Sequence, residues 1–260
     1  MARIIKLVKA YKAIFIFLVV WELMSRLHIV NPLFIPPFSQ VVGSIGKLTA
    51  EGVLPLHIFI SLKRSVLGFA IASAAAIPLG LLLAGRPRRL QIALEPLIEI
   101  FSQTNPFIFF HILLFFLGIG EATKISMIAW TCTWPILFNT YSGVQNIDPE
   151  LLKAARGFGL KGYRLARKVL VPAAAPGIFS GMRMSAGYSF VLLIAAEMMG
   201  ASSGLGWLVI SGQSGYQMVK VFAAVTVIAF LGLLMDAGMQ AVESKVVFME
   251  KKSFSAKAKA

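Results

Sequence analysis

The chain has 260 residues, of which 58% are hydrophobic and only 14% are charged, and its mean hydropathy is +0.80. Soluble domains are about 45–50% apolar, and a soluble fold with so little charge would expose much apolar surface to water, so an ordinary soluble domain is excluded. The net charge of +14 fits either nucleic-acid binding or the enrichment of Lys and Arg in the cytoplasmic loops of membrane proteins.

Six apolar segments are long enough to cross a bilayer, which takes ~20 residues per helix. They cover residues 11–27, 58–84, 92–117, 124–144, 177–199 and 218–242. The basic start of the first segment resembles a signal peptide, but no cleavage site follows, and we expect a retained helix. Prolines interrupt the connection 31–57, in which residues 39–50 suit a short surface helix. The sequence therefore predicts an all-α integral membrane protein with about six transmembrane helices, forming a single domain over residues 1–260.

The basic residues are concentrated in alternate connections. Eighteen of the 25 Lys and Arg residues lie in segments 1–12, 86–91, 148–172 and 244–260. Because cytoplasmic loops carry an excess of Lys and Arg, both termini are predicted to be cytoplasmic. This distribution accounts for the positive charge without nucleic acid, for which no soluble basic domain is present.

The connection 148–172 is the most informative of these segments. Asp148 and Pro149 form a typical helix start, an acidic cap followed by proline at the first helical position. An apolar stripe follows at helical spacing, formed by Leu151, Leu152, Ala155 and Phe158. Gly159 is expected to interrupt the helix, and a second amphipathic stretch is expected to end at Pro172. The pattern alone fits either an interfacial helix on anionic headgroups or a helix docked in the groove of a partner.

The same connection resembles the EAA loop of ABC-importer permeases. In that loop E-A-A is followed three residues later by G, and then by an apolar residue and Pro. Here Lys153-Ala154-Ala155 precede Gly159, an apolar run precedes Pro172, and Lys153 stands where the family usually has Glu. Likeness to the nitrate, sulfonate and taurine branch extends over nearly the whole chain. It is carried by His57 to Gly85, Phe116 to Glu121 with Lys124-Ile125, Ala196-Glu197-Met198 with Gly204-Leu205-Gly206, and Met235 to Glu243.

The resemblance implies a type I ABC-importer-like permease in the bacterial cytoplasmic (inner) membrane. Its implied partners are a cytoplasmic ATPase dimer, an extracytoplasmic substrate-binding protein and a second copy of the permease, in a homodimer. The residues implied in coupling to the ATPase are Lys153, Ala154, Ala155, Phe158, Gly159 and Pro172. The branch implies a small anion as substrate, such as a sulfonate, taurine or nitrate, although segment 101–110 departs from the Pro-rich apolar stretch of that branch.

The chain is not expected to be an enzyme. It has no G-x-x-x-x-G-K-[ST] loop to hold nucleotide phosphates, so we expect no cofactor in this chain and ATP to be bound by the partner subunit. With Cys132 as its single cysteine and no metal-ligand spacing among three histidines, no metal site is expected. A membrane enzyme would need a clustered acid–base or metal set, and none is evident.

The densest polar cluster in the apolar segments precedes Pro106, which is expected to bend its helix. Broken helices that line a cavity are typical of transport paths. We predict a translocation path lined by Gln103, Thr104, Asn105, Trp130, Thr133 and Trp134. The alternative role for these side chains is hydrogen bonding between helices. The alternative function is a self-contained secondary transporter or channel, which predicts internal repeats and midplane charge relays; neither is evident.

Overall fold

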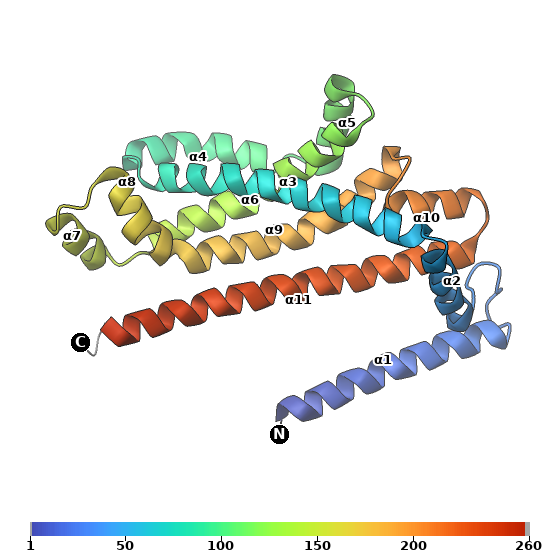
Figure 1. Ribbon diagram of the computed structural model, residues 1–260. Coiled ribbons are helices and arrows are strands. Elements are labelled where there is room, and N and C mark those ends of the chain that lie inside the picture. The colour runs from blue at the N-terminus through green and yellow to red at the C-terminus, as the bar shows by residue number, and fades with distance from the viewer. Residues whose placement is uncertain (1, 258–260) are drawn as a thin grey trace. The chain divides into compact units, whose positions relative to one another are not determined.

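The computed structural model describes the backbone of residues 2–257 and the side chains of residues 12, 13 and 15–244. Within that part of the chain every regular element is helical, as Figure 1 shows, which confirms the all-α prediction. The elements are α1 (Ala2–Arg26), α2 (Phe38–Ala50), α3 (Val53–Ala84), α4 (Arg88–Ser102), α5 (Pro106–Leu117), α6 (Glu121–Gln145), α7 (Pro149–Gly157), α8 (Gly162–Leu165), the π-helical η1 (Ala166–Leu170), α9 (Val171–Gly200), α10 (Leu205–Ser214) and α11 (Met218–Lys257). Most of the basic side chains predicted at the two cytoplasmic ends lie outside the described residues.

The chain divides into two compact units, each assembled from two stretches of sequence. Unit 1 contains Met1–Ser61 and Glu197–Phe230, and unit 2 contains Leu62–Ala196 and Leu231–Ala260. The boundaries fall inside α3, α9 and α11, so these three helices contribute residues to both units.

Helix α6 is the centre of unit 2. Its buried Ile128, Cys132 and Ile136 pack with Ala72 of α3 and Leu193 of α9, and the three helices run alongside one another in Figure 1. Because α6 is covered by its neighbours, its residues need not all be apolar. This explains why it carries several Thr, Trp and Asn side chains in an otherwise apolar chain.

Glycines allow α6 to approach its two neighbours closely. A Cβ atom added to Gly68 of α3 would lie 2.6 Å from the Cβ of Ile128, and one added to Gly177 of α9 would lie 2.8 Å from the Asn139 carbonyl oxygen. Such contacts are shorter than a side chain tolerates. Small residues at helix crossings are typical of membrane bundles, where close packing holds helices together.

Unit 1 is organised by the end of α1. The indole of Trp21 contacts the rings of Phe38 and Phe222 and donates its N–H to the carbonyl of Pro36 at 3.0 Å. The Glu22 carboxylate accepts the Ser39 N–H at 3.0 Å, which satisfies a free donor in the first turn of α2. The predicted short helix after the prolines is thus confirmed as α2.

Three described helical stretches are long and apolar enough to cross a membrane by themselves, namely Val53–Ala84, Gly162–Gly200 and Met218–Ser244. Helices α4 and α5 provide a fourth span if the pair is counted as one, although they are bent by 83° where they meet. The segment 92–117, predicted as one span, is therefore two helices. Helix α6 is long enough but too polar to be identified by composition, and the total of six spans stays a prediction.

Two further segments differ from the sequence prediction. The helix after Gly159 does not end at Pro172, because α8, η1 and α9 continue as one helix from Gly162 to Gly200. Proline lacks the N–H that a helix interior needs, and its ring clashes with the carbonyl four residues earlier. For Pro172 that carbonyl belongs to Lys168, inside the wider π turn of η1, which makes room for the ring. Residues 205–214, predicted as part of a connecting loop, form α10.

Candidate functional site

The helix predicted in the connection 148–172 is present as α7. The Asp148 carboxylate accepts the Glu150 N–H at 2.8 Å and Pro149 is the first helical residue, so the predicted cap is confirmed. After the helix ends, Gly159 adopts a left-handed φ of +77°, which glycine reaches without steric cost. The N–H of Gly159 is donated to the Arg156 carbonyl at 2.9 Å, and the chain then turns into α8.

The residues of the predicted apolar stripe of α7 lie in two different environments, one packed and one exposed. Leu151 and Leu152 pack into the core formed by the end of α6 and the start of α9, and Ala155 is buried. Phe158, in contrast, is 87% exposed, and Tyr163 in α8 is 76% exposed. The buried part of the stripe therefore anchors α7 to its own chain, while the rings of Phe158 and Tyr163 are open to a partner. Docking of this helix in the groove of a partner stays a prediction.

The remaining residues predicted for coupling are mostly at the surface. Lys153, Ala154, Gly159 and Pro172 are exposed, while Ala155 is not. Basic side chains cover the same connection: Arg156, Lys161, Arg164, Arg167 and Lys168 are all exposed. The connection thus presents two aromatic rings surrounded by positive charge.

The second candidate site lies at the break between α4 and α5. The Asn105 side chain accepts the Phe107 N–H at 2.9 Å and Pro106 begins α5, so a new helix starts in place of a continued α4. The bend predicted at Pro106 is confirmed, and it leaves residues 103–105 outside both helices.

A cavity of about 490 Å³ opens beside this break. It is lined by Ser102, Gln103, Thr104, Asn105 and Pro106, by Trp130, Thr131, Trp134 and Pro135 of α6, and by Tyr188, Val191 and Leu192 of α9. Five of the six residues predicted for the path are among them, but Thr133 is not. The Thr133 hydroxyl instead donates to the Ala129 carbonyl at 2.7 Å, within its own helix.

Sequence reasoning missed the contribution of α9 to this cavity. Thr131 is next to a predicted residue and could have been included by proximity. Tyr188 and Val191 are distant in sequence and reach the cavity only through the packing of α9 on α6. Their spacing of three residues marks one helix face, but nothing in the sequence shows which neighbour that face meets.

Aromatic contacts hold the tryptophans of the cavity in place. The Trp130 ring stacks on Phe109 with 4.4 Å between centroids and meets Trp134 edge-on at 5.0 Å. The indole nitrogens of both tryptophans are shielded from solvent and have no hydrogen-bond acceptor among the described residues. Buried donors normally find a partner, because an unsatisfied one costs ~1–3 kcal/mol.

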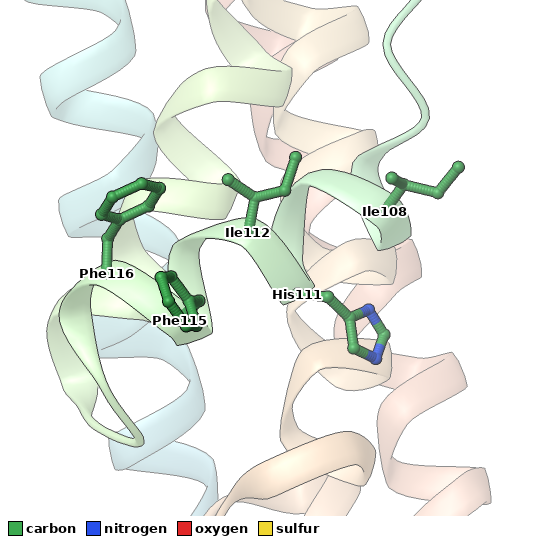
Figure 2. Close-up of a pocket in the computed structure, with 5 residues that line it drawn as sticks. All are labelled: Ile108, His111, Ile112, Phe115 and Phe116. Carbon is green, nitrogen blue, oxygen red and sulfur yellow. The ribbon is translucent and has the colours of Figure 1, made fainter.

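A second hollow, of about 520 Å³, lies over α5. Figure 2 shows that all five side chains lining it project from this one helix: Ile108, His111, Ile112, Phe115 and Phe116. Phe115 is 85% exposed and Phe116 77% exposed. A face of this kind suits contact with lipid or a neighbouring helix better than enclosure of a ligand. The described part of the chain contains no group of three potential metal ligands among His, Cys, Asp and Glu.

The motif around Glu197 has a structural role in unit 1. Glu197 is 1% exposed, and its carboxylate accepts the Ser61 hydroxyl at 2.8 Å and the Gly206 N–H at 3.0 Å. The Leu205 N–H is donated to the Ser61 hydroxyl at 2.9 Å, and the Gly204 N–H to His57 Nδ1 at 2.9 Å. Donors at the start of α10 are thus satisfied by α3 and α9.

Comparison with known proteins agrees with this architecture. Residues 76–248 match the family described as "Binding-protein-dependent transport system inner membrane component". The nitrate import permease protein NrtB of Synechocystis is 30% identical, over 95% of this chain and 92% of its own length. SsuC of Bacillus subtilis, named for aliphatic sulfonates transport, is 29% identical over 89% of this chain and 84% of its own. An inward-facing structure of the MetNI methionine ABC transporter shares the fold, with a TM-score of 0.65 at 21% identity, covering 76% of this chain and 98% of that one.

The family match over most of the chain and the shared fold agree with each other. The chain belongs to the family of binding-protein-dependent transport system inner membrane components, as an ABC-importer permease that resembles the nitrate, sulfonate and taurine branch.

Proposed function

We propose that this chain forms the translocation path of an ATP-driven uptake system and is coupled to a separate ATPase through residues 148–172. The observation that carries the proposal is the division of the α7 stripe: Leu151 and Leu152 fix the helix to unit 2, while Phe158 projects 87% exposed beyond it. An anchored helix with an exposed aromatic ring can transmit force. A helix held only by its partner could not.

The packing of unit 2 connects α7 to the helices that line the cavity. Leu151 and Leu152 contact the core of α6 and α9, and the same two helices supply Trp130, Trp134 and Tyr188 to the cavity. Protein interiors are close-packed and barely compressible. A displacement of α7 by the ATPase would therefore move the helices that line the cavity.

The assembly that we propose follows the family. A cytoplasmic ATPase dimer binds and hydrolyses ATP, so that this chain needs no cofactor, and an extracytoplasmic binding protein delivers the substrate. A second copy of this chain completes the path in a homodimer. The proposed orientation has both termini in the cytoplasm, which places the basic connection 148–172 on the side of the ATPase. The proposed substrate is a small anion such as a sulfonate, taurine or nitrate.

The coupling is tested by affinity purification of this chain from its native membrane in mild detergent. A cytoplasmic ATPase in stoichiometric amount is the expected companion, and Phe158→Ala is expected to lose it while remaining in the membrane. The matched control is Phe34→Ala, which truncates a ring that is 66% exposed in unit 1 and should retain the ATPase. A wild-type chain that purifies alone, in several detergents and with nucleotide present, would contradict the proposal and favour a self-contained transporter.

A further inference from the structure

The side chain of Gln91, near the start of α4, closes the turn between α3 and α4. Its Nε2 lies 3.3 Å from the Leu83 carbonyl oxygen, 3.2 Å from that of Ala84 and 2.9 Å from that of Arg86. Leu83 and Ala84 belong to the last turn of α3, where carbonyl groups lack the partner that a continued helix would provide. The amide N–H groups are thus shared among carbonyls at and just after the end of α3.

The oxygen of the same amide is bound by α6. Gln91 Oε1 accepts the Tyr141 hydroxyl and the Gln145 Nε2, both at 3.1 Å. Tyr141 and Gln145 are four residues apart, so they project from one face of α6. A side chain that only capped α3 would need its N–H groups and nothing more. The two bonds to Oε1 are an additional link, between the start of α4 and the end of α6 that leads into α7.

Little of α4 is covered by its neighbours. None of its residues, all of which the structure describes, is buried. The half-buried ones are spaced by three or four and share one face of the helix, namely Gln91, Leu94, Ile98 and Ser102. Ile98 packs against the core of unit 2. At the far end of α4 the Phe101 ring meets the Trp130 ring of α6 edge-on, with 5.9 Å between centroids.

The two contacts between α4 and α6 lie at opposite ends of α4. Gln91 and Phe101 are ten residues apart in sequence, about 15 Å along a helix. Their partners Tyr141 and Trp130 are eleven residues apart, about 16 Å along α6. Helix α4 therefore runs antiparallel to α6, from the end next to α7 to the break beside the cavity. Held at both ends it has to follow α6, whereas without the Gln91 link its start is released.

We propose that Gln91 is a positioning residue for coupling, a joint that makes α4 follow α6 when the ATPase displaces α7. Leu151 and Leu152 carry the displacement into α6 and α9. The hydrogen bonds of Gln91 carry it on to α4, whose last residue, Ser102, lines the cavity. Hydrogen-bond networks and rigid helices can carry energetic coupling between distant sites. The inference rests on the proposed uptake function and adds the α4 side of the cavity to the parts that move.

The link to α6 can be removed while the cap of α3 is kept. Tyr141→Phe/Gln145→Met deletes both donors to Gln91 Oε1 and leaves the amide N–H groups in place. The control Ser73→Ala/Gln240→Met also removes one hydroxyl and one amide. Ser73 donates only within its own helix, and Gln240 is exposed on α11, so the control leaves the joint intact.

The first measurement follows the α4–α5 break itself. Gln103→Cys places a thiol at an exposed position of the break, and the native Cys132 is buried. Its labelling by a water-soluble maleimide is timed in the complex of permease, ATPase and binding protein, with ADP and then with ATP. The ATP-dependent change in rate should persist in the control and fall at least about twofold in the variant without the link, while the ATPase still co-purifies. A full change in that variant, or none in the parent, overturns the inference.

Cross-linking distinguishes a joint from a gate. Gln91→Cys/Gln145→Cys replaces the hydrogen bond between the two side chains by thiols that a short bifunctional maleimide connects. Uptake per ATP hydrolysed should be low before cross-linking and recover after it, because α4 and α6 move together. Gln91→Cys alone, treated in the same way, should stay low. If the cross-link abolishes uptake, the two helices separate during transport and the inference is overturned.

The uptake function is judged on the wild-type complex, in proteoliposomes supplied with its binding protein and labelled taurine, ethanesulfonate or nitrate. ATP-dependent uptake by the wild type, together with undiminished coupling in Tyr141→Phe/Gln145→Met, overturns the inference and leaves the uptake function standing. Absence of ATP-dependent uptake of all three compounds by the wild type overturns the uptake function, and with it the inference.

Discussion

The α9–α10 turn of unit 1 and the α4–α5 break of unit 2 both place polar side chains among apolar helices. The two places differ in whether these polar groups are hydrogen-bonded. At the turn, the Ser61 hydroxyl donates to the Glu197 carboxylate, and both groups accept backbone N–H groups of α10. At the break, Trp130 and Trp134 keep indole donors without a described acceptor. Satisfied polar groups specify a fold, whereas the two indole donors at the break contribute no hydrogen bond to it.

The largest effect on stability is expected from a substitution that overlaps sterically with the hydrogen-bonded cluster of Glu197 and Ser61. A Cβ atom on Gly204 would lie within 2.5 Å of three Glu197 side-chain atoms, at a backbone φ of +113° that other residues rarely adopt. Gly204→Val should therefore cost ~3–5 kcal/mol, from backbone strain and overpacking together. The measurement is the yield and thermal unfolding of the protein in detergent. Gly46→Ala, where a Cβ meets nothing within 4 Å, is the control and should behave like wild type.

The next largest effect on stability is expected when one hydrogen-bonding group is removed from the same cluster. Ser61→Ala leaves the Leu205 N–H without its acceptor and the Glu197 carboxylate without one donor, which should lower the free energy of unfolding by ~2–3 kcal/mol. Ser73→Ala on the same helix removes a hydroxyl that only donates to the Phe69 carbonyl at 2.8 Å and should cost less than ~1 kcal/mol. Similar losses in Tm for the two variants would show that the cluster at the turn stabilises the protein no more than the single hydrogen bond of Ser73 does.

A smaller effect on stability is expected to distinguish Trp21, whose indole N–H is hydrogen-bonded, from Trp134, whose indole N–H has no described acceptor. Trp21→Phe loses a hydrogen bond to Pro36 and should destabilise unit 1 by ~1–2 kcal/mol. Trp134→Phe removes an N–H donor that has no partner. Removing this unsatisfied donor is favourable and offsets the packing that the smaller ring loses, so the free energy of unfolding should change by less than ~1 kcal/mol. Thermal unfolding of the two variants side by side is the measurement. A greater loss for Trp134→Phe than for Trp21→Phe would indicate that Trp134 is a structural residue.

The sequence was most informative where local chemistry decides the structure. Asp148, Pro149 and Gly159 act within one helix turn of themselves, and α7 begins and ends as they predict. Pro106 and Asn105 likewise end one helix and start another through their own backbone and side chain. The polar cluster at the break was therefore identified together with five of the twelve residues that line its cavity.

Tertiary packing explains what the sequence could not show. Periodicity placed Phe158 on the same stripe as Leu151, but only the fold shows that the two point to different surroundings. Thr133 has the helical spacing of the cavity residues but does not line the cavity, while Tyr188 enters the cavity from a distant segment. Helix α10 was missed because its first donors are satisfied by α3 and α9, not by its own flanking residues.

The last expected effect on stability concerns Gly159, at the exposed end of α7. A Cβ atom there would meet nothing within 4 Å, so the size of a new side chain is irrelevant to the fold and only its left-handed φ of +77° is unfavourable, by ~1–2 kcal/mol. Gly159→Ala and Gly159→Leu should therefore unfold at the same Tm, slightly below wild type. If the ATPase docks here, the larger side chain should interfere, and Gly159→Leu should lose more co-purifying ATPase and transport than Gly159→Ala. Full transport by Gly159→Leu would contradict the coupling proposal, because the fold itself leaves this position open.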